Sequence, residues 1–570
     1  MKLTGAQIVC ESLLLEGVDV VFGIPGGAIL PLYQTMSSYP DLKHILTRHE
    51  EGASMAADGY ARSTGKVGVC MATSGPGATN LVTGIATAQM DSVPMVAITG
   101  QVGRAALGKD AFQETDISGI TLPITKHSYL VMKPEDIAPA IKEAFYIANT
   151  GRPGPVLIDI PKDVFTEETE FIYPETLDLP GYKPVIDGDQ LQVEKANKLI
   201  AEAERPVILA GHGVIISRAY NELLELAEKA QIPVITTLLG RSSFPDAHIL
   251  FAGMPGMHGM AYASLAIDEA DLVIGLGMRF DDRITGNVDL FAPNAKIIHV
   301  DIDPAEIDKN VKTDVPIIGD LARVLRQINK IVKPKTHTKW LKRVEKLKVD
   351  HPSLRIRETD KLLPQQVVRD LCEITDGKSI VVTGVGQHQM WAAQHYAAKE
   401  PNLFLTSGGL GSMGYEVPAA LGAQVGRPDK VVWSVAGDGG FQMTMSELAT
   451  IVENNLPVKF AIFNNGYLGM VHQWQDIFYG KDYYATSYTG NPDFVKLAEA
   501  FGILGIRVTD KGQSLDAIRQ AMDHDGPVVV DFVLAKEENV YPMIPAGQST
   551  ADLMEEKFDD MEVSKRGSTS

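Results

Sequence analysis

The sequence contains little cysteine. Its 570 residues include only Cys10, Cys70 and Cys372, which are widely spaced, odd in number and never arranged as Cys-x-x-Cys. This pattern offers neither a zinc site nor a disulfide framework, and it fits a reducing compartment. The N-terminus has acidic side chains among its apolar ones, unlike a signal peptide or a transit peptide. We therefore expect a cytoplasmic protein.

The sequence also lacks a long apolar run and an excess of positive charge. Its longest charge-free stretch, 67–90, contains Ser-Gly-Pro-Gly and several threonines, and is typical of a strand, a loop and a helix. Against 52 Lys and Arg there are 72 Asp and Glu, a formal net charge of −20. We expect neither a membrane nor a nucleic acid as partner, although local donors can still bind phosphate groups.

The rest of the composition, 45% hydrophobic and 22% charged, is that of a globular protein too long for one core. We predict an α/β protein with three doubly wound parallel-sheet domains at 1–165, 190–335 and 363–548, followed by a tail at 549–570. The stretch 165–190 loosens into a linker with three prolines. The basic stretch 333–362 is interpreted as a solvated linker helix rather than an anion-binding site.

The chain is organised around the 29-residue stretch from Gly437 to Asn465, which a predicted strand precedes. Val431–Val435 and Val458–Phe463 are apolar runs of strand length, and Met443–Val452 has helical spacing, so the segment predicts a βαβ unit. Asp438 and Asn465 each follow one strand. In open parallel sheets ligands bind beyond the carboxyl ends of the strands, so these side chains converge if the strands are neighbours.

The predicted point of convergence suits Mg²⁺ and a diphosphate. Asp438, Asn465 and the Tyr467 carbonyl are hard oxygen ligands of the kind Mg²⁺ accepts. Gly437, Gly439 and Gly440 let the backbone approach a diphosphate at the start of a helix. Gly-Asp-Gly followed after 24 residues by Asn-Asn is the thiamine diphosphate (ThDP) and Mg²⁺ signature. Here the chain resembles the ThDP-dependent decarboxylase and carboligase superfamily.

The resemblance assigns roles in the first domain, the pyrimidine-binding one. Glu50, in His-Glu-Glu-Gly, matches the family's activating glutamate, whose carboxyl group promotes the imino tautomer of the cofactor so that the cofactor removes its own C2 proton. By itself the phrase would be a solvated helix start. Other first-domain residues are implied near the pyrimidine, the substrate channel or a flavin, although as isolated motifs they would be loops: Gly27, Pro76, Asn80, Phe112, Gln113, Arg152 and Lys162.

The central domain carries features of a dinucleotide site. Strands precede Gly-x-Gly, although the first lacks the GxGxxG spacing, so the signal is moderate. The Arg-Phe-Asp-Asp-Arg segment at 279–283 is either a pair of diphosphate-binding guanidinium groups or a structural salt-bridge cluster. It resembles the flavin-binding segment of acetohydroxyacid synthase. By that resemblance the FAD residues are Gly211, His212, Gly213, Met257, His258, Gly277, Arg279, Asp281, Arg283, Asp301, Ile302, Gly319 and Asp320.

The third domain, which binds the diphosphate by resemblance, supplies the rest of the cofactor site. Val385–His388 is predicted as a loop whose Gly386, Gln387 and His388 contact the diphosphate. The Gly411 carbonyl would bond the cofactor's amino group, and Met413, otherwise a core residue, would wedge between its rings and bring that group next to C2. Met470 and Trp474 would line the second-substrate pocket, whereas a buried core Trp is the alternative.

From about residue 3 to 548 the chain resembles the catalytic large subunit of the biosynthetic, FAD-containing acetohydroxyacid (acetolactate) synthases. The resemblance implies decarboxylation of pyruvate on ThDP with Mg²⁺, and condensation with pyruvate or 2-ketobutyrate, the first common step towards valine, leucine and isoleucine. FAD would be structural. The two halves of each site would come from different subunits of a homodimer or homotetramer, and a separate regulatory small subunit is expected.

Three other functions compete with this one. An FAD-dependent pyruvate oxidase would pass electrons to flavin, and a catabolic acetolactate synthase would make the same product without FAD; segment 279–283 weighs against both. A non-catalytic binding subunit is disfavoured because Glu50, Asp438 and Asn465 are all present. The chain departs from the commonest family pattern at Ile24, at Gly103 on the inhibitor-binding channel, and at Glu416-Val417, where Gly-Leu is usual.

Overall fold

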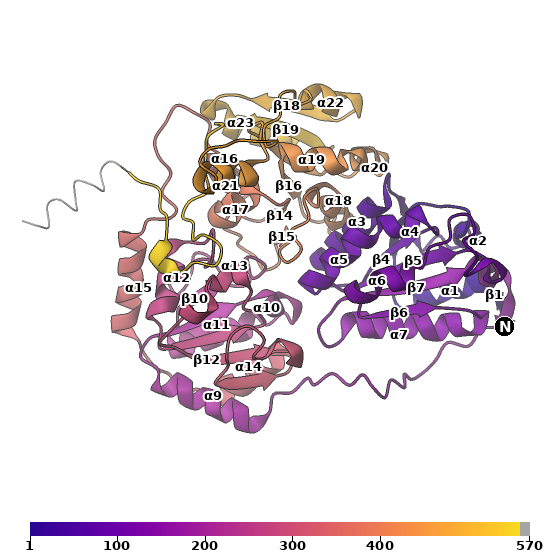
Figure 1. Ribbon diagram of the computed structural model, residues 1–570, viewed down its shortest axis with the longest axis horizontal. Coiled ribbons are helices and arrows are strands. Elements are labelled where there is room, and N and C mark those ends of the chain that lie inside the picture. Colours follow the sequence, from indigo (N-terminus) through magenta and orange to yellow (C-terminus); the bar gives the residue numbers. More distant parts are fainter. Residues whose placement is uncertain (559–570) are drawn as a thin grey trace, which may run out of the picture.

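The computed structural model describes residues 1–558 and forms three α/β units, each built on a parallel sheet (Figure 1). The α/β prediction is therefore confirmed. The predicted disorder of Ser564–Ser570 concerns residues outside the described range. None of the helices within 1–558 combines the length and the apolar character needed to cross a bilayer.

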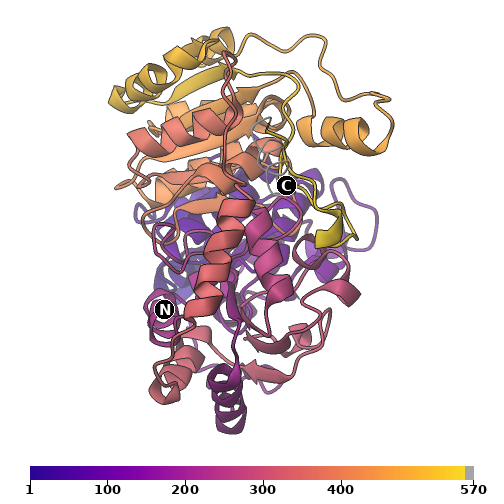
Figure 2. The ribbon, with the colours of Figure 1, turned by 90° about the vertical axis from the view of Figure 1, so that its left-hand side faces the viewer.

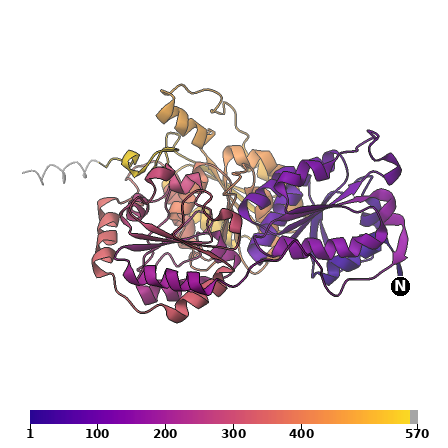
Figure 3. The same cartoon turned by 60° about the horizontal axis from the view of Figure 1, so that its bottom comes forward.

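The first unit has a six-stranded sheet of order β3-β2-β4-β5-β7-β6, with helices on both faces (Figure 3). Its central strands are buried along their whole length, as expected for a parallel sheet covered on both sides. The strands are β2 (Val20–Gly23), β3 (Lys43–Leu46), β4 (Gly68–Ala72), β5 (Met95–Gln101), β6 (His127–Leu130) and β7 (Pro155–Pro161). The helices are α1 (Gly5–Leu15), α2 (Leu30–Met36), α3 (Glu50–Thr64), α4 (Pro76–Asn80), α5 (Val82–Asp91), α6 (Ile117–Thr121), α7 (Ile137–Asn149) and α8 (Lys162–Thr166).

The third unit repeats that topology: its sheet order, β15-β14-β16-β17-β19-β18, matches the first sheet strand for strand. Its strands are β14 (Ile380–Thr383), β15 (Phe404–Thr406), β16 (Val432–Gly437), β17 (Lys459–Asn464), β18 (Leu504–Val508) and β19 (Val528–Val533). Its helices are α16 (Pro364–Ile374), α17 (Gln387–His395), α18 (Glu416–Gly426), α19 (Asp438–Thr444), α20 (Leu448–Glu453), α21 (Gly469–Phe478), α22 (Phe494–Ala500) and α23 (Ser514–Asp523).

The central unit has five parallel strands in the order β10-β9-β11-β12-β13. The strands are β9 (Pro206–Ala210), β10 (Val234–Thr236), β11 (Leu272–Leu276), β12 (Lys296–Asp301) and β13 (Val315–Ile318). The helices are α9 (Gln190–Glu202), α10 (His212–Ile216), α11 (Tyr220–Ala230), α12 (Ala261–Glu269), α13 (Asp282–Thr285) and α14 (Leu321–Ile331).

The first and third units meet through α3 and α18, which cross without large side chains between them. A Cβ on Gly59 would lie 2.1 Å from the Ala419 carbonyl oxygen, and one on Gly422 would lie 1.8 Å from that of Ala56. Only glycine allows this approach. The largest apolar cluster runs through the crossing into all three units, so they share one core.

The connecting segments differ in part from expectation. Between 165 and 190 the only strand is β8 (Glu168–Glu170), which pairs antiparallel with β1 (Lys2–Thr4). The basic stretch forms α15 (Thr338–Asp350), seen along its length in Figure 2, but it is not fully solvated because Trp340, Val344 and Leu347 are buried. The described part of the tail is packed: Glu555 pairs with His351 at 2.8 Å and Glu556 with Arg357 at 2.9 Å.

Two local predictions are wrong. Gln387 and His388 lie not in a loop but in the first turn of α17. The helix expected over Met443–Val452 begins earlier, at Asp438, and is broken by the 3₁₀ turn η6 (Met445–Glu447) between α19 and α20. β16, which ends at Gly437, passes directly into α19, so the backbone N–H groups of the first turn of α19 point towards the sheet edge.

Candidate functional site

The carboxyl edge of the third sheet brings the predicted metal ligands together. β16 and β17 are hydrogen-bonded neighbours, as expected. Asp438 opens α19 just past β16, and its Oδ2 accepts a hydrogen bond from the Gly466 N–H at 2.8 Å, one residue beyond Asn465. The Asn465 Oδ1 accepts from the Tyr467 N–H at 3.1 Å. The βαβ segment thus places its acid and its amide at one point.

Burial dominates the electrostatics of Asp438. The side chain is 1% exposed, and its desolvation raises the pKa to about 6. Hydrogen bonds from Asn491 Nδ2 at 2.7 Å and from the backbone N–H groups of Gly466 and Gly439 oppose that rise, because they stabilise the carboxylate. A carboxylate in this setting is poised for a cation that restores its charged form.

Glycines keep the same edge open. Gly386, after β14, has a φ of +150°, a backbone conformation that L side chains rarely adopt. A Cβ on Gly437 would lie 2.9 Å from His388 Nδ1, and one on Gly439 would lie 2.5 Å from the Tyr488 hydroxyl. β14 and β16, the first and third strands of this sheet, are adjacent, which is the switch point where ligands bind in doubly wound sheets.

The first turn of α17 supplies two further polar groups. Gln387 accepts a hydrogen bond from Asn465 Nδ2 at 3.3 Å and donates to Gln473 at 2.9 Å, so it braces the amide ligand. Burial lowers the pKa of His388 to about 3, and its Nε2 has no hydrogen-bond partner among the described residues. An unsatisfied buried nitrogen beside the glycine edge fits a ligand oxygen.

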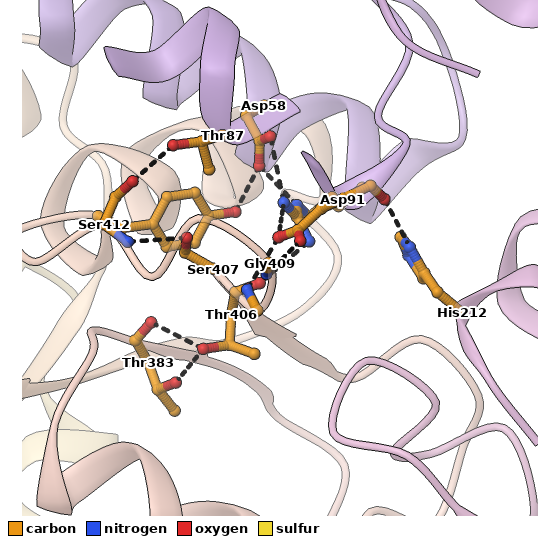
Figure 4. A network of polar contacts seen from close by, with 12 residues as sticks. Asp58, Thr87, Asp91, His212, Thr383, Thr406, Ser407, Gly409 and Ser412 are labelled. Atoms are coloured by element: carbon orange, nitrogen blue, oxygen red, sulfur yellow. Dashed lines mark hydrogen bonds and ion pairs between the residues drawn. The ribbon is translucent and has the colours of Figure 1, made fainter. Parts of the chain in front are cut away.

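The loop that carries Gly411 and Met413 is held by the first unit (Figure 4). The Asp91 carboxylate accepts from the N–H groups of Gly408 at 2.9 Å and Gly409 at 2.6 Å. Thr87 and Ser412 share a hydrogen bond of 2.7 Å. Since Thr87 and Asp91 lie on α5, that helix fixes the loop of the third unit.

A buried ion-pair network supports that loop from α3. Arg62 donates to Asp58 at 2.6 Å, to Asp91 at 2.9 Å and to the Thr406 carbonyl at 3.0 Å. Burial would lower the pKa of Arg62, but the neighbouring carboxylates outweigh it and raise that pKa well above its usual value. The guanidinium therefore stays charged. His212, at the start of α10, adds the central unit through a 2.8 Å contact with the Asp91 carbonyl.

A cavity of about 1360 Å³ opens between the three units. It is lined from the third unit by Gly386, Gly411, Met413, Met470 and Trp474. From the central unit it is lined by His212, Gly213, Met257, His258, Gly277, Arg279, Asp281, Arg283, Asp301, Ile302, Gly319 and Asp320. Arg152 of the first unit also lines it. Most residues predicted for FAD thus share one cavity with part of the ThDP set.

Several polar groups in this cavity lack partners. Both ring nitrogens of His258 and the Oδ1 of Asp281 are buried without a hydrogen bond among the described residues. Burial also lowers the pKa of His258 to about 3. Arg279 pairs with Asp281 at 3.3 Å and Arg283 with Asp282 at 3.7 Å, so segment 279–283 has the ion pairs of the structural alternative while still facing the cavity.

Other central residues have clear local roles. Gly211 does not line the cavity, but Gly213 and Gly277 approach so closely that a Cβ on either would lie 2.6 or 2.5 Å from the other's Cα. Asp320 caps α14 by accepting from the Arg323 N–H. Arg152 pairs with Glu306 at 2.6 Å, and Asp301 has its pKa raised to about 6 by burial.

The predicted pyrimidine residues form a separate cluster at the carboxyl edge of the first sheet. Asn80, at the end of α4, donates to Glu50 Oε2 at 2.9 Å. A Cβ on Gly77 would lie 3.3 Å from Glu50 Oε1, and one on Gly75 would lie 2.9 Å from Gln113 Cα. Glu50, Asn80 and Gln113 thus surround the short α4, which begins at Pro76.

This cluster stands apart from the cavity within one chain. None of the described residues Gly27, Glu50, Pro76, Asn80, Phe112, Gln113 and Lys162 lines it. Phe112 is 88% exposed, an unusual position for a phenylalanine in a soluble fold unless another surface covers it. Lys162 opens α8 on the same sheet edge. The predicted site residues thus form two clusters, each at the carboxyl edge of its own sheet.

Sequence reasoning missed several residues at these sites. Asn491 bonds Asp438, Asp91 holds the loop of Met413, and Glu447 reaches the start of α3. Asn491 follows the Tyr-Thr-Gly turn at 488–490, which is a weak loop signal. The backbone N–H groups that donate to Asp91 and Glu447 are more than 300 residues away, so no local pattern could reveal these contacts.

Family models match all three units. Residues 3–120 match the thiamine pyrophosphate enzyme N-terminal TPP binding domain, residues 193–328 the central domain, and residues 384–532 the C-terminal TPP binding domain. The two matches that name a TPP-binding domain fall on the two sheets with identical strand order.

Curated relatives match nearly the whole chain. The acetolactate synthase large subunit of Corynebacterium glutamicum is 52% identical over 97% of this chain and 90% of its own length. The acetolactate synthase of Mycobacterium bovis is 51% identical, covering 98% and 93%. The acetolactate synthase large subunit of the red alga Pyropia yezoensis is 48% identical, covering 97% and 95%.

Proposed function

The chain belongs to the acetolactate synthase large subunits, a family of thiamine pyrophosphate enzymes, and we propose that it joins pyruvate, after decarboxylation, to a second 2-oxoacid. With pyruvate the product is 2-acetolactate, and with 2-ketobutyrate it is 2-aceto-2-hydroxybutyrate. One observation carries the proposal: Asp438 and Asn465 converge where β16 and β17 end, next to the switch point between β14 and β16, and the neighbouring loop with Met413 faces the large cavity.

ThDP and Mg²⁺ fit the residues at that edge. Asp438, Asn465 and the Tyr467 carbonyl are the proposed metal ligands, and the unpartnered His388 Nε2 and the glycine edge are the proposed diphosphate contacts. When bound, ThDP supplies a carbon centre that adds to the 2-oxoacid and stabilises the charge left after CO₂ departs. The part proposed for the protein is that Met413 would hold the cofactor in place and that the enclosing cavity would exclude water.

Glu50 is proposed to hold and share a proton with the pyrimidine ring of a cofactor bound to a second copy. The separation of the Glu50 cluster from the cavity of its own chain supports this arrangement, because each half-site is incomplete alone. We therefore propose at least a homodimer, with Gly27, Gln113, Phe112 and Lys162 facing the neighbouring copy's substrate.

FAD is proposed to occupy the central part of the cavity. The unsatisfied nitrogens of His258 and the guanidinium groups of Arg279 and Arg283 suit its polar and diphosphate groups. Carbon–carbon bond formation needs no net electron transfer, so the flavin would be structural. Met470 and Trp474, which line the same cavity, are proposed to shape the second-substrate pocket.

The remaining proposals concern organisation and setting. We propose domain bounds of 1–165, 190–335 and 363–548, followed by a tail. A homodimer or homotetramer, a separate regulatory small subunit and a cytoplasmic setting are proposed because the family resemblance implies the first two and the three unpaired cysteines fit the third.

The test is anaerobic incubation of the purified chain with ThDP, Mg²⁺, FAD, pyruvate and 2-ketobutyrate. We expect both acetohydroxyacids without any electron acceptor and with the flavin still oxidised. Bleached flavin with acetate or acetyl phosphate would favour a pyruvate oxidase instead. Full activity after FAD removal would favour the catabolic type of synthase.

A further inference from the structure

Glu447 is a buried carboxylate that reaches from the third unit to the backbone in front of Glu50. It ends η6 and is 1% exposed. Its Oε1 accepts hydrogen bonds from the N–H groups of Arg48 and His49, both at 3.0 Å. Its Oε2 accepts from the Arg48 N–H at 3.2 Å and from the Thr450 hydroxyl at 2.7 Å.

These contacts fix the start of α3. His49 is the N-cap of that helix, with an extended backbone at φ −149°, and Glu50 is its first residue. A carboxylate at a helix N-terminus is favoured by the helix dipole and satisfies N–H groups that the helix cannot. A Cβ on Gly52 would lie 2.3 Å from Glu447 Oε1, so the carboxylate packs directly against the first turn.

The same short stretch of chain also carries the proposed metal ligand. Asp438 opens α19, and Glu447 closes the 3₁₀ turn that follows it. The segment 438–447 therefore touches the diphosphate half-site of its own chain at one end and the Glu50 half-site at the other. Under the proposed function these half-sites complete two different active sites.

We propose that Glu447 is a positioning residue for Glu50, so that each chain's diphosphate-binding segment sets the carboxyl group which that chain contributes to the neighbouring copy. The inference rests on the proposed function. It predicts that loss of Glu447 harms the site that uses the same chain's Glu50 and spares the site that uses the same chain's Asp438.

The first measurement compares E447Q with the wild type. The amide keeps the size of the side chain but loses the charge and turns one acceptor into a donor facing N–H groups. We expect kcat to fall by about 10- to 100-fold, the effect of a misplaced catalytic group, with KM for pyruvate and ThDP affinity within about twofold. Unchanged kcat, or loss of ThDP affinity alone, would overturn the proposal.

The deciding experiment uses hybrid dimers purified through two different tags. A hybrid of one E447Q chain and one D438N chain keeps one site with intact Asp438 and intact Glu50, so it should retain about half of the wild-type activity. If Glu447 instead served the diphosphate half of its own chain, both sites would be damaged, and activity as low as in the E447Q homodimer would overturn the proposal.

Two controls distinguish failure of the role proposed for Glu447 from failure of the proposed function, in which two copies share each active site. An E50Q and D438N hybrid should also keep about half of the activity, and if it is inactive, sharing of sites between copies is wrong and the inference falls with it. E453Q is the matched substitution, because Glu453 pairs with the Arg48 side chain at the surface rather than with its backbone. E453Q should leave kcat, the KM for pyruvate and the ThDP affinity unchanged.

A readout without cofactor tests the contact itself. In apo protein, hydrogen–deuterium exchange of the peptide covering 46–53 should speed up in E447Q while that of 438–444 stays as in the wild type. T450V removes the hydroxyl that donates to Glu447 at 2.7 Å and also contacts the Leu46 carbonyl at 3.3 Å. It should give a smaller increase in the same peptide, spread over 48–53 and not confined to Leu46, and it covers the case that E447Q folds poorly. Equal exchange in both variants and the wild type would contradict the positioning role.

Discussion

The first and third units share one topology but carry different chemistry at matching places. Their six strands follow the same order, and α3 and α18, which follow the second strand of each, cross each other. At the crossing Gly59 meets Ala419 and Gly422 meets Ala56, so 56 and 59 on one helix correspond to 419 and 422 on the other. Counted back from there, Glu50 corresponds to Met413.

The difference teaches how one scaffold provides two half-sites. In the first unit Glu50 is the first residue of α3. The matching residue of the third unit, Met413, carries a thioether and lies three residues before α18, which itself begins at Glu416. After the third strand the contrast is reversed: β4 leads into Ser74-Gly75-Pro76-Gly77, without an acid, whereas β16 leads into Gly437-Asp438-Gly439. Each unit thus lacks the groups that the other has, and the fold alone assigns neither role.

Replacing Glu50, the acid of the first unit, should have the largest effect on activity. E50Q should lower carboligation by at least about 100-fold, the usual contribution of a positioned proton-transfer group, while Asn80 still binds the side chain. E51Q, at the next residue, should stay close to the wild type. The measurement is the rate of acetohydroxyacid formation with ThDP binding followed in parallel. An undiminished rate of carboligation in E50Q with ThDP bound would contradict the role assigned to Glu50.

Forcing the two units apart tests their shared crossing. In G422A the new methyl group would lie 1.8 Å from the Ala56 carbonyl oxygen, which is backbone and cannot move aside cheaply. We expect a loss of about 3 kcal/mol in the free energy of unfolding, at the upper end for overpacking. G181A is the control, because a Cβ there meets nothing within 4 Å. Denaturant unfolding curves with the same midpoint for G422A and G181A would contradict the close contact between α3 and α18.

The sequence predicted this architecture well where the signals were local. Buried strands, the glycine turns and the pair Asp438 and Asn465 were all predicted from patterns within about 30 residues, because parallel strands followed by helices repeat with that period. It did not predict contacts between units. The clamp of Asp91 on Gly409, the Glu447 cap and the helical setting of His388 depend on tertiary packing that no single segment encodes.

Glu416, at one of the positions where the sequence departs from the resemblance, gives the third unit a buried acid at the start of α18, as Glu50 gives the first unit an acid at the start of α3. It is fully buried at the start of α18, neither carboxyl oxygen has a hydrogen-bond partner among the described residues, and burial raises its pKa to about 7. The pKa of Glu416 in the folded protein is above its value in the unfolded chain, so ionisation of this carboxyl group destabilises the folded state. This loss of stability is absent below about pH 4.5, grows up to about pH 7 and is complete above it.

E416Q should therefore stabilise the protein above pH 7 by about 3 kcal/mol, and by less than about 1 kcal/mol at pH 5. E225Q, a substitution at an exposed position on α11, should not change the free energy of unfolding at either pH. Urea unfolding at pH 5 and pH 8 measures both. Equal stability changes at the two pH values would mean that the Glu416 carboxyl finds a partner that stabilises its charge.

The smallest expected effect concerns the acid that the first unit lacks. Burial raises the pKa of Asp438 to about 6, and a metal ligand must be deprotonated, so Mg²⁺ affinity should fall about tenfold from pH 7 to pH 5 and level off above pH 7. N491A removes the side-chain donor that opposes this rise, so its decline should begin at higher pH. Fluorescence titration with Mg²⁺ at saturating ThDP measures both, with N294A, exposed in the central unit, as control. An affinity that is flat from pH 5 to 8 would mean that Asp438 is already fully charged over that range and that its burial does not control Mg²⁺ binding.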